Sequence, residues 1–385
     1  MKKLFLRFMV SMAILTPFVL ASCSDDNDEP TVPPVTESEL SGSIKTSKTL
    51  DANITYTITG PVIVEDGATL TIPAGTVIKA EKGFSNYILV LQGGKIYVNG
   101  TADKPVVMTA DISNAEAGHW GGLIINGRAP LAGNTTGSTE INAAYIYGGN
   151  IPADNSGSIT YLKLEFTGAK SSADVEHNGL TLNGVGNGTI IENIYIIEGA
   201  DDAIEFFGGT VNVKNLLAVN PDDDMFDFTQ GYTGTLENAY GIWEAGYSSS
   251  ESDPRGIEAD GNWDGLTPDQ QGQSNFRVVN MTIDLKLPYN TTDVKKQMQD
   301  VIKIRRGAKA TITNALIKGT GAALDLVDFT DGKGAGDATS SINLTNRLTN
   351  PILGKTTNGT GTVTFSDNNT GCASNIFAWT GYTNF

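Results

Sequence analysis

The chain has 385 residues, a formal net charge of −17 and only two cysteines, Cys23 and Cys372. The acidic excess argues against nucleic acid and anionic membrane surfaces as partners, and it favours cations, basic proteins or neutral glycans. Two thiols allow at most one intramolecular disulfide, and a function for Cys23 in the N-terminal signal removes that option. The fold is therefore expected to be stabilised by its core alone.

The first 22 residues have the pattern of an export signal. Lys2, Lys3 and Arg7 precede an apolar run from Phe8 to Leu20, which is too short and too basic at its start for a membrane span. The run ends in the sequence LASC, which resembles the bacterial lipoprotein box. That resemblance implies that Cys23 is acylated and becomes the mature N-terminus. Each buried methylene adds about 0.8 kcal/mol of membrane affinity, so we expect a stable lipid anchor.

An acidic and Pro/Ser/Thr-rich segment follows the cysteine. The sequence SDDNDE at 24–29 resembles the export signal that sends lipoproteins of Bacteroidetes to the outer face of the outer membrane. The composition up to about Ser47 predicts a flexible tether over 23–47. We therefore expect a lipid-anchored outer-membrane protein that faces the cell exterior, with a periplasmic orientation as the alternative.

From Ile54 onward, short runs of Val, Ile, Leu, Thr and Tyr alternate with Gly, Pro, Asn and Asp. Such runs are typical of strands, and Gly-rich corners about every six to nine residues favour a parallel β-helix over a sandwich. We predict an all-β fold, a single-stranded right-handed parallel β-helix over 48–362. A loop insertion is expected near 243–275, and residues 363–385 are expected to form an aromatic C-terminal closure.

A repeat within residues 188–242 supports this prediction. Asn193 recurs as Asn215 and, one position late, as Asn238, and the series continues at Asn280 and Asn314. These residues are expected to form an asparagine ladder at one corner. A second series is offset by the same 22 positions, in which Asp201, Asp202, Glu205, Phe206 and Gly209 recur as Asp223, Asp224, Asp227, Phe228 and Gly231. Repeats of this period indicate stacked rungs, with Phe206 and Phe228 in the interior.

The acidic members of the repeat are candidate metal ligands. Stacking places equivalent carboxylates about 4.8 Å apart, and a hard cation such as Ca²⁺ would offset their repulsion. The predicted ligands are Asp201, Asp202, Glu205, Asp223, Asp224 and Asp227. Two alternatives remain open, namely solvated acids that cap turn amides and catalytic carboxylates.

The predicted insertion has the composition of a sugar-binding surface, because aromatic faces stack on pyranose rings and carboxylates bind hydroxyls. The candidate ligand-binding residues are Trp243, Tyr247, Glu258, Asp260, Trp263 and Asp264. The alternative is that the tryptophans pack the insertion onto the solenoid.

Other candidate sites are weaker. His119 and His177 have no zinc-site spacing, and both are expected at the surface or at a corner. Arg305 and Arg306 could act as bases in a lyase, but they follow the acids by about 80 residues. If this separation corresponds to four rungs, the arginines lie roughly 19 Å from the acids along the stack. That distance is too long for one active site.

Several segments resemble a known family. GATLTIPAGTVIKA resembles the first rungs of bacterial surface proteins with pectate-lyase-like β-helices. NGLTLNGVGNGTIIENI, ADDAIEFFGGTVNVKNL and DDDMFDFTQGYTGTLENA are similar to a functionally uncharacterised surface lipoprotein family of Bacteroidetes with a pectate-lyase-like right-handed parallel β-helix. The resemblance implies fold and location but no established chemistry.

From these observations we expect a non-enzymatic binding or adhesion module for a glycan or a surface protein. One alternative is a Ca²⁺-dependent polysaccharide lyase or glycoside hydrolase. The fold and the Asp pairs favour this alternative. The chain lacks the catalytic motifs in the order in which enzymes of this fold carry them, and this opposes it. The other is a structural component of the envelope or surface layer.

Overall fold

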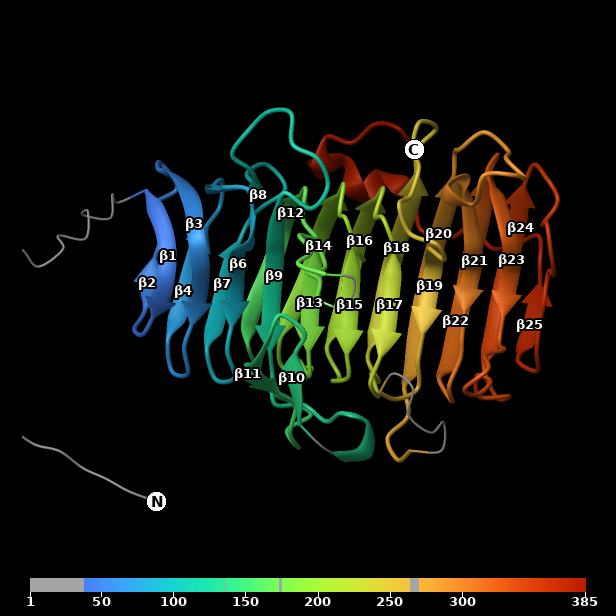
Figure 1. Ribbon diagram of the computed structural model, residues 1–385, viewed down its shortest axis with the longest axis horizontal. Coiled ribbons are helices and arrows are strands. Elements are labelled where there is room, and N and C mark those ends of the chain that lie inside the picture. Colours follow the sequence, from blue (N-terminus) through green and yellow to red (C-terminus); the bar gives the residue numbers. More distant parts are fainter. Residues whose placement is uncertain (1–37, 135, 173–174, 264–269) are drawn as a thin grey trace, which may run out of the picture. The chain divides into compact units, whose positions relative to one another are not determined.

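The computed structural model describes residues 38–134, 136–172, 175–263 and 270–385. These residues form a right-handed parallel β-helix, which confirms the predicted fold class. Its 23 strands stack rung upon rung, and a separate antiparallel hairpin is formed by β10 (Gly137–Thr139) and β11 (Asn142–Tyr147) (Figure 1). Within the described ranges, no helix has the length and apolar character that a membrane crossing requires.

Each rung contributes to three faces. Face B carries the acidic residues and consists of β6 (Gly83–Val90), β9 (Trp120–Asn126), β13 (Leu180–Asn183), β15 (Ile204–Phe207), β17 (Phe226–Thr229), β19 (Arg255–Ala259), β21 (Gln297–Lys303) and β23 (Ala322–Asp328). Face A contains β5 (Val77–Ala80) and β8 (Val106–Ala110), and face C contains β2 (Lys48–Thr49), β4 (Thr69–Pro73), β7 (Lys95–Asn99) and β25 (Thr362–Phe365).

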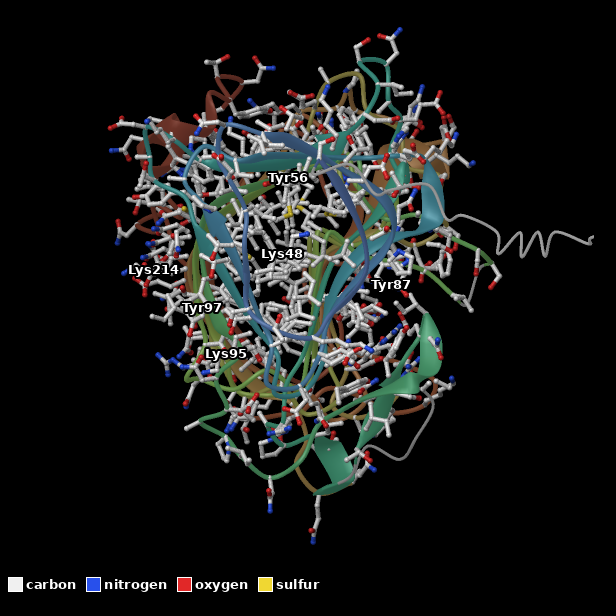
Figure 2. The ribbon with its side chains drawn as sticks, turned by 90° about the vertical axis from the view of Figure 1, so that its left-hand side faces the viewer. Lys48, Tyr56, Tyr87, Lys95, Tyr97 and Lys214 are labelled. Carbon is white, nitrogen blue, oxygen red and sulfur yellow. The ribbon has the colours of Figure 1, made fainter. Side chains whose placement is uncertain are left out.

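Longer strands turn a corner and belong to two faces. The strands β12 (Gly157–Glu165), β14 (Ile190–Ile197), β16 (Asn212–Val219), β18 (Thr235–Trp243), β20 (Asn275–Leu285), β22 (Lys309–Gly319) and β24 (Ser341–Leu348) run from face C into face A. At the start of the solenoid, β1 (Glu39–Ile44) and β3 (Thr55–Val64) join faces A and B. Figure 2, which looks along the stack, shows side chains filling the space between the faces, with Lys95, Tyr97 and Lys214 outside face C.

The corner between faces C and A confirms the predicted asparagine ladder. Asn193, Asn215, Asn238, Asn280 and Asn314 all have φ between 54° and 61°. Each of the four amides after Asn193 donates a hydrogen bond to the asparagine of the preceding rung, over 2.8–2.9 Å. Asparagine tolerates this left-handed conformation better than most residues because its short side chain can bond locally. The ladder therefore fixes the bend of each rung.

The predicted interior stack is also confirmed. Phe206 and Phe228 are fully buried, and their ring centroids lie 5.1 Å apart at an interplanar angle of 10°. Phe276 of the next rung continues the stack 4.2 Å from Phe228. Aromatic stacking between rungs contributes to stability beyond the area that it buries.

The predicted boundaries of the solenoid need correction. Strand β1 begins at Glu39 and pairs with β3, so the solenoid begins inside the predicted tether. The predicted insertion is interrupted by β19, with a loop at 244–254 before this strand and the loop residues 260–263 and 270–274 after it among those that the structure describes. Two short 3-10 helices, η1 (Ala132–Asn134) and η2 (Val294–Lys296), lie in other loops. Cys23 and the predicted signal and acidic segment lie outside the described residues.

The C-terminal segment covers a side of the solenoid, not its end as the predicted closure implies. It contains η3 (Ser374–Thr380), and Phe377 packs with Tyr195, Leu217 and Tyr240 on the outer side of face A. These three residues come from β14, β16 and β18, in the middle of the stack. An outward-facing apolar strip on these strands makes this side contact possible.

Candidate functional site

Three carboxylates lie in register on the outer side of face B. Glu205 of β15 pairs with Asp227 of β17, and Asp227 pairs with Glu258 of β19. Side chains alternate along a strand, so Phe206 and Phe228 point into the core while the carboxylates beside them point outward. Neighbouring parallel strands lie about 4.8 Å apart. The repeat therefore brings like charges together, as predicted.

Two pairs of aspartates from the preceding turns complete the acidic stack. Asp201 and Asp202 precede β15, and Asp223 and Asp224 precede β17. The Asp224 amide donates to Asp202 Oδ1 over 2.8 Å, and the Arg255 amide donates to Asp224 Oδ1 over 2.7 Å. Asp202 thus caps an amide of the turn before β17, as the alternative of turn-capping acids predicts, whereas Asp224 accepts from the first residue of strand β19. However, Asp202 is 6% exposed and Asp224 is 1% exposed, so neither is the solvated acid of that alternative.

The carboxylates line a cavity of about 150 Å³, which we call the acidic basin. Asn178 donates to Glu205 Oε2 over 2.6 Å and holds one wall in place. The turn of the β10–β11 hairpin contributes Glu140, and the loop before β13 contributes Glu176. The complete lining is Glu140, Glu176, Asn178, Asp201, Asp202, Glu205, Asp223, Asp224, Asp227 and Glu258.

The environment of the basin opposes ionisation of its acids. Burial raises the pKa of Asp202 and Glu205 well above the usual range, and neighbouring carboxylates raise both further. Burial, followed by repulsion from Glu258, raises the pKa of Asp223 to about 7. Full ionisation of the basin is therefore unfavourable unless a positive charge enters it.

Carboxylate oxygens in the described part of the chain come together in four groups of three, with all ligand atoms of a group within 4.8 Å of one another. Three groups belong to the basin and share members. We call Asp201, Asp202 and Asp223 the first triad, Asp202, Glu205 and Asp227 the central triad, and Asp224, Asp227 and Glu258 the third triad. The separate triad, Asp300, Asp325 and Asp328, lies on β21 and β23.

The first and third triads have basic side chains beside them. Lys170 Nζ lies 4.0 Å from Asp201 Oδ1 in the first triad. Arg255 Nη1 and Arg305 Nη2 lie 3.1 Å and 2.6 Å from Glu258 Oε1 in the third. These groups neutralise part of the negative charge at the two ends of the basin.

The central triad has no such partner. Among the described residues, no lysine or arginine forms an ion pair with Asp202, Glu205 or Asp227. Oδ1 of Asp227 is buried and accepts no hydrogen bond from this part of the chain. Three oxygen ligands and a buried acceptor without a donor fit a hard cation, which prefers carboxylate oxygens. The central triad is therefore the best candidate for a metal ion.

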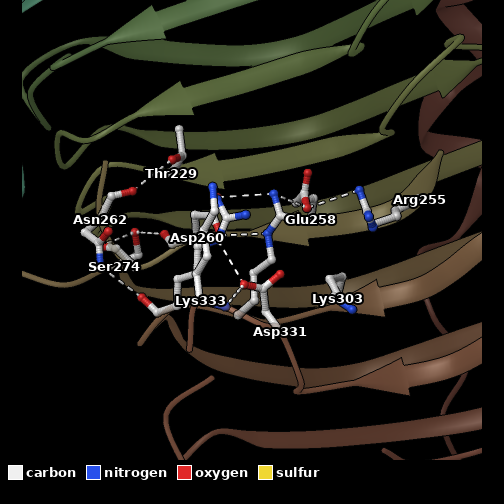
Figure 3. Close-up of polar contacts among 12 residues, drawn as sticks. Thr229, Arg255, Glu258, Asp260, Asn262, Ser274, Lys303, Asp331 and Lys333 are labelled. Carbon is white, nitrogen blue, oxygen red and sulfur yellow. Dashed lines mark hydrogen bonds and ion pairs between the residues drawn. The ribbon is translucent and has the colours of Figure 1, made fainter. Parts of the chain in front are cut away.

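The predicted separation of four rungs between the arginines and the acids is too large, because β17, β19 and β21 follow one another rung by rung and Arg305 comes just after β21. Strands β19 and β21 belong to consecutive rungs, because the intervening residues form long loops and not additional rungs. Arg305 consequently reaches Glu258 over 2.6 Å and Asp260 over 2.8 Å, the two carboxylates that Figure 3 labels. Arg306 Nη1 lies 3.0 Å from Asp260 Oδ2. Arg305 thus lies at the edge of the basin and helps to hold Glu258, whereas Arg306 pairs with Asp260 and Asp331, which do not line the basin.

The predicted sugar-binding surface is not formed by its tryptophans. Trp243 is fully buried, and its indole donates to the Pro221 carbonyl over 3.2 Å. Tyr247 packs on Trp243 and donates to the same carbonyl. Trp263 stacks on Tyr147 of the hairpin, with centroids 6.5 Å apart. The alternative, in which both tryptophans pack the insertion onto the solenoid, is confirmed.

The acidic members of that predicted surface have a different role. Glu258 belongs to the third triad, and Asp260 is held by Arg305 and Arg306. Asp264 lies outside the described residues. Glu258 is therefore part of the acidic basin, to which the sequence prediction did not assign it.

Both histidines are buried, which corrects the expectation of surface or corner positions. His119 is 3% exposed and its Nε2 lies 2.8 Å from Asp111 Oδ1. His177 packs against Phe84 and Tyr87 and donates from Nε2 to the Phe84 carbonyl over 2.9 Å. Burial lowers the pKa of His177 to about 4, so its ring is neutral at physiological pH. Neither histidine joins a metal-ligand group of the described residues.

Sequence reasoning missed Glu140, Lys170, Glu176 and Asn178. They lie in the hairpin and loop that separate β9, β12 and β13, where the rung repeat is interrupted. No periodic signal therefore connects them with the acidic stack. Only the tertiary structure brings them to the basin.

The comparison with protein families agrees with this architecture. Residues 42–382 match the family model described as pectate-lyase like beta helix domain. No curated protein and no solved structure shows a significant match to the chain.

Proposed function

The chain belongs to the family of pectate-lyase-like β-helix domains, a membership that leaves its activity open, and we propose that it is a cation-dependent binding module. The observation that carries this proposal is the central triad. Asp202, Glu205 and Asp227 converge within 4.8 Å, with a buried oxygen of Asp227 that accepts no hydrogen bond from any described residue. Ca²⁺ is the proposed ion, since it accepts several carboxylate oxygens in irregular geometry.

The cation would serve as the binding element of a surface site. Hydroxyl groups of a glycan or a carboxylate of a surface protein could complete its coordination from the open side of the basin. The acidic net charge of the chain favours a partner that is neutral or reaches the site through the cation. Acylation at Cys23 would anchor the module in the outer membrane and display it at the cell exterior.

A second candidate is a Ca²⁺-dependent polysaccharide lyase or glycoside hydrolase. The observation in its favour is Arg305, whose guanidinium lies 2.6 Å from Glu258 at the edge of the acidic basin. A base and an electrophilic metal at neighbouring positions are what proton abstraction beside a carboxylate requires. Against it, both Glu258 and Asp260 pair with Arg305, so the guanidinium is engaged.

Calcium-dependent melting tests the metal site. Adding Ca²⁺ to the chelator-treated protein should raise its melting temperature, and ligand at about 100 times its Kd adds roughly 2.7 kcal/mol of stability. The double variant Asp202→Asn, Asp227→Asn should lose this response. It should be no less stable than the parent without metal, because the asparagine at 202 keeps an acceptor for the Asp224 amide and two repelling charges are gone.

The matched control removes two acids outside the basin, Asp66→Asn and Glu237→Gln, whose side chains are 74% and 42% exposed. It should respond to Ca²⁺ like the parent protein. A parent protein that melts at the same temperature with Ca²⁺ and with chelator contradicts the proposal. Glycan-array binding with and without Ca²⁺, followed by a product assay on acidic polysaccharides, then separates binding from catalysis.

A further inference from the structure

Lys170 has an unusual position at the edge of the acidic basin. Its ammonium lies 2.6 Å from Glu251 Oε1, 3.1 Å from Glu176 Oε1 and 4.0 Å from Asp201 Oδ1. The three carboxylates come from three separate segments of the chain, and the lysine side chain is only 25% exposed. One positive charge is thus surrounded by acids in the way that a bound cation would be.

A second lysine has the same relationship to the separate triad. Lys303 Nζ lies 2.5 Å from Asp328 Oδ2 and 3.6 Å from Asp300 Oδ2. Lys303 is labelled in Figure 3 and belongs to β21, the strand that pairs with β19 on the rung after Glu258. Two of the four carboxylate triads in the described residues therefore contact an ammonium group, a third contacts two arginines, and the central triad alone has no basic partner.

We propose that the Lys170 ammonium takes the place of a metal ion in the first triad, so that the acidic basin binds one divalent cation and not two. This inference rests on the proposed cation site at the central triad. The two triads share Asp202 and both lie between the rungs of β15 and β17, so ions in both would be close neighbours and repel strongly. A lysine ammonium is compact and carries one positive charge, half the charge of a divalent ion. Its covalent attachment keeps it beside the first triad.

Lys170 therefore determines both the number of ions and the affinity for the first of them. Its positive charge lies 4.0 Å from Asp201, the chain neighbour of Asp202, and therefore opposes a cation in the central triad. Replacing Lys170 by an uncharged residue should open the first triad to a second ion. It should also tighten binding at the central triad by about tenfold, because a repulsive charge is removed.

The number of bound Ca²⁺ ions tests this inference. Isothermal titration and native mass spectrometry of the purified protein should give one ion for the parent protein and two for Lys170→Met. Lys170→Arg retains the charge and should bind one ion. Lys214→Met is the matched control, since it removes a lysine that is 46% exposed on face C, and it should also bind one ion. Lys170→Gln provides a second neutral variant, and its melting temperature and that of Lys170→Met show that the solenoid is intact.

The outcomes separate this inference from the proposed function. One ion in both the parent and the neutral variants, with unchanged affinity, overturns the role of Lys170 but leaves the central site in place. Two ions in the parent protein likewise overturn the role of Lys170 and leave the central site in place. No ion in the parent but one in the neutral variants overturns the proposed function and supports the lysine as an internal cation. No ion in any variant overturns both.

Discussion

The rings of Phe206 and Phe228 stack with their centroids 5.1 Å apart, while the carboxylates of Glu205 and Asp227, one residue earlier in each strand, face the opposite side. The same register that aligns the aromatic core thus also aligns the repelling acids. Because rungs are hydrogen-bonded to one another, the acids cannot separate without disturbing the core. The core therefore supplies the stability that keeps the acidic basin together.

Truncation of the aromatic stack should destabilise the solenoid strongly. Phe228→Ala is expected to cost about 3–5 kcal/mol of unfolding free energy, because it leaves a cavity between Phe206 and Phe276. Urea unfolding followed by circular dichroism measures this loss. Phe365→Ala, at a residue that is 51% exposed, is the control and should cost under about 1 kcal/mol. Equal effects of the two substitutions would show that the stack does not stabilise the fold.

The asparagine ladder allows conformational and hydrogen-bond effects to be separated at Asn238. This residue has φ of 59°, donates to Asn215 and accepts from Asn280. Both Asn238→Gly and Asn238→Ala remove the side-chain hydrogen bonds, at about 1 kcal/mol for each bond. Alanine also disfavours the left-handed conformation, so its variant should be less stable than the glycine variant by about 1 kcal/mol. Chemical denaturation of both variants checks this order, and a more stable alanine variant would contradict it.

Without metal, the protein should become more stable as the pH falls from 8 towards 5. The acids of the basin, including Asp223 with a pKa of about 7, bind protons more tightly in the folded state than in the unfolded chain. Their contribution to stability is therefore fully present at low pH and is lost as the pH rises through the folded pKa. His177 opposes this trend between about pH 4 and 6.5, but it is one group against several.

Melting temperatures in chelator across this pH range test the expectation. The Asp202→Asn, Asp227→Asn variant should show a weaker dependence, since two of the contributing groups are removed. A parent protein whose melting temperature rises steadily from pH 5 to pH 8 would mean that the basin does not hold protons in the folded state.

The lipid anchor is tested by Cys23→Ala. Acylation at this cysteine is the proposed attachment to the membrane, so the variant should leave the outer-membrane fraction and collect as a precursor or as soluble protein. Fractionation and immunoblotting measure the change, with Cys372→Ala as the control that keeps the anchor. Unchanged membrane association of Cys23→Ala would contradict the lipoprotein proposal. Loss of the protein on protease treatment of intact cells would support display at the cell surface.

The repeat was sufficient to predict the fold and half of the site. A spacing of 22 residues between Asn193 and Asn215, and between Phe206 and Phe228, predicts register, and the register determines which carboxylates stack. Strand residues alternate between inside and outside, so the aromatic interior and the acidic exterior follow from the same pattern. The asparagine ladder follows because each corner requires the same left-handed conformation.

The positions of the loops depend on the tertiary structure alone. Lys170, Glu176 and Asn178 reach the basin from a segment without a repeat, and Arg305 reaches it because long loops reduce the number of rungs that separate it from Glu258. Composition indicated a sugar-binding surface around Trp243, yet that side chain is in the core. Local periodicity specifies the contacts between adjacent rungs, because each rung must match its neighbour. The contacts of loops arise between residues far apart in sequence, and no spacing along the chain encodes them.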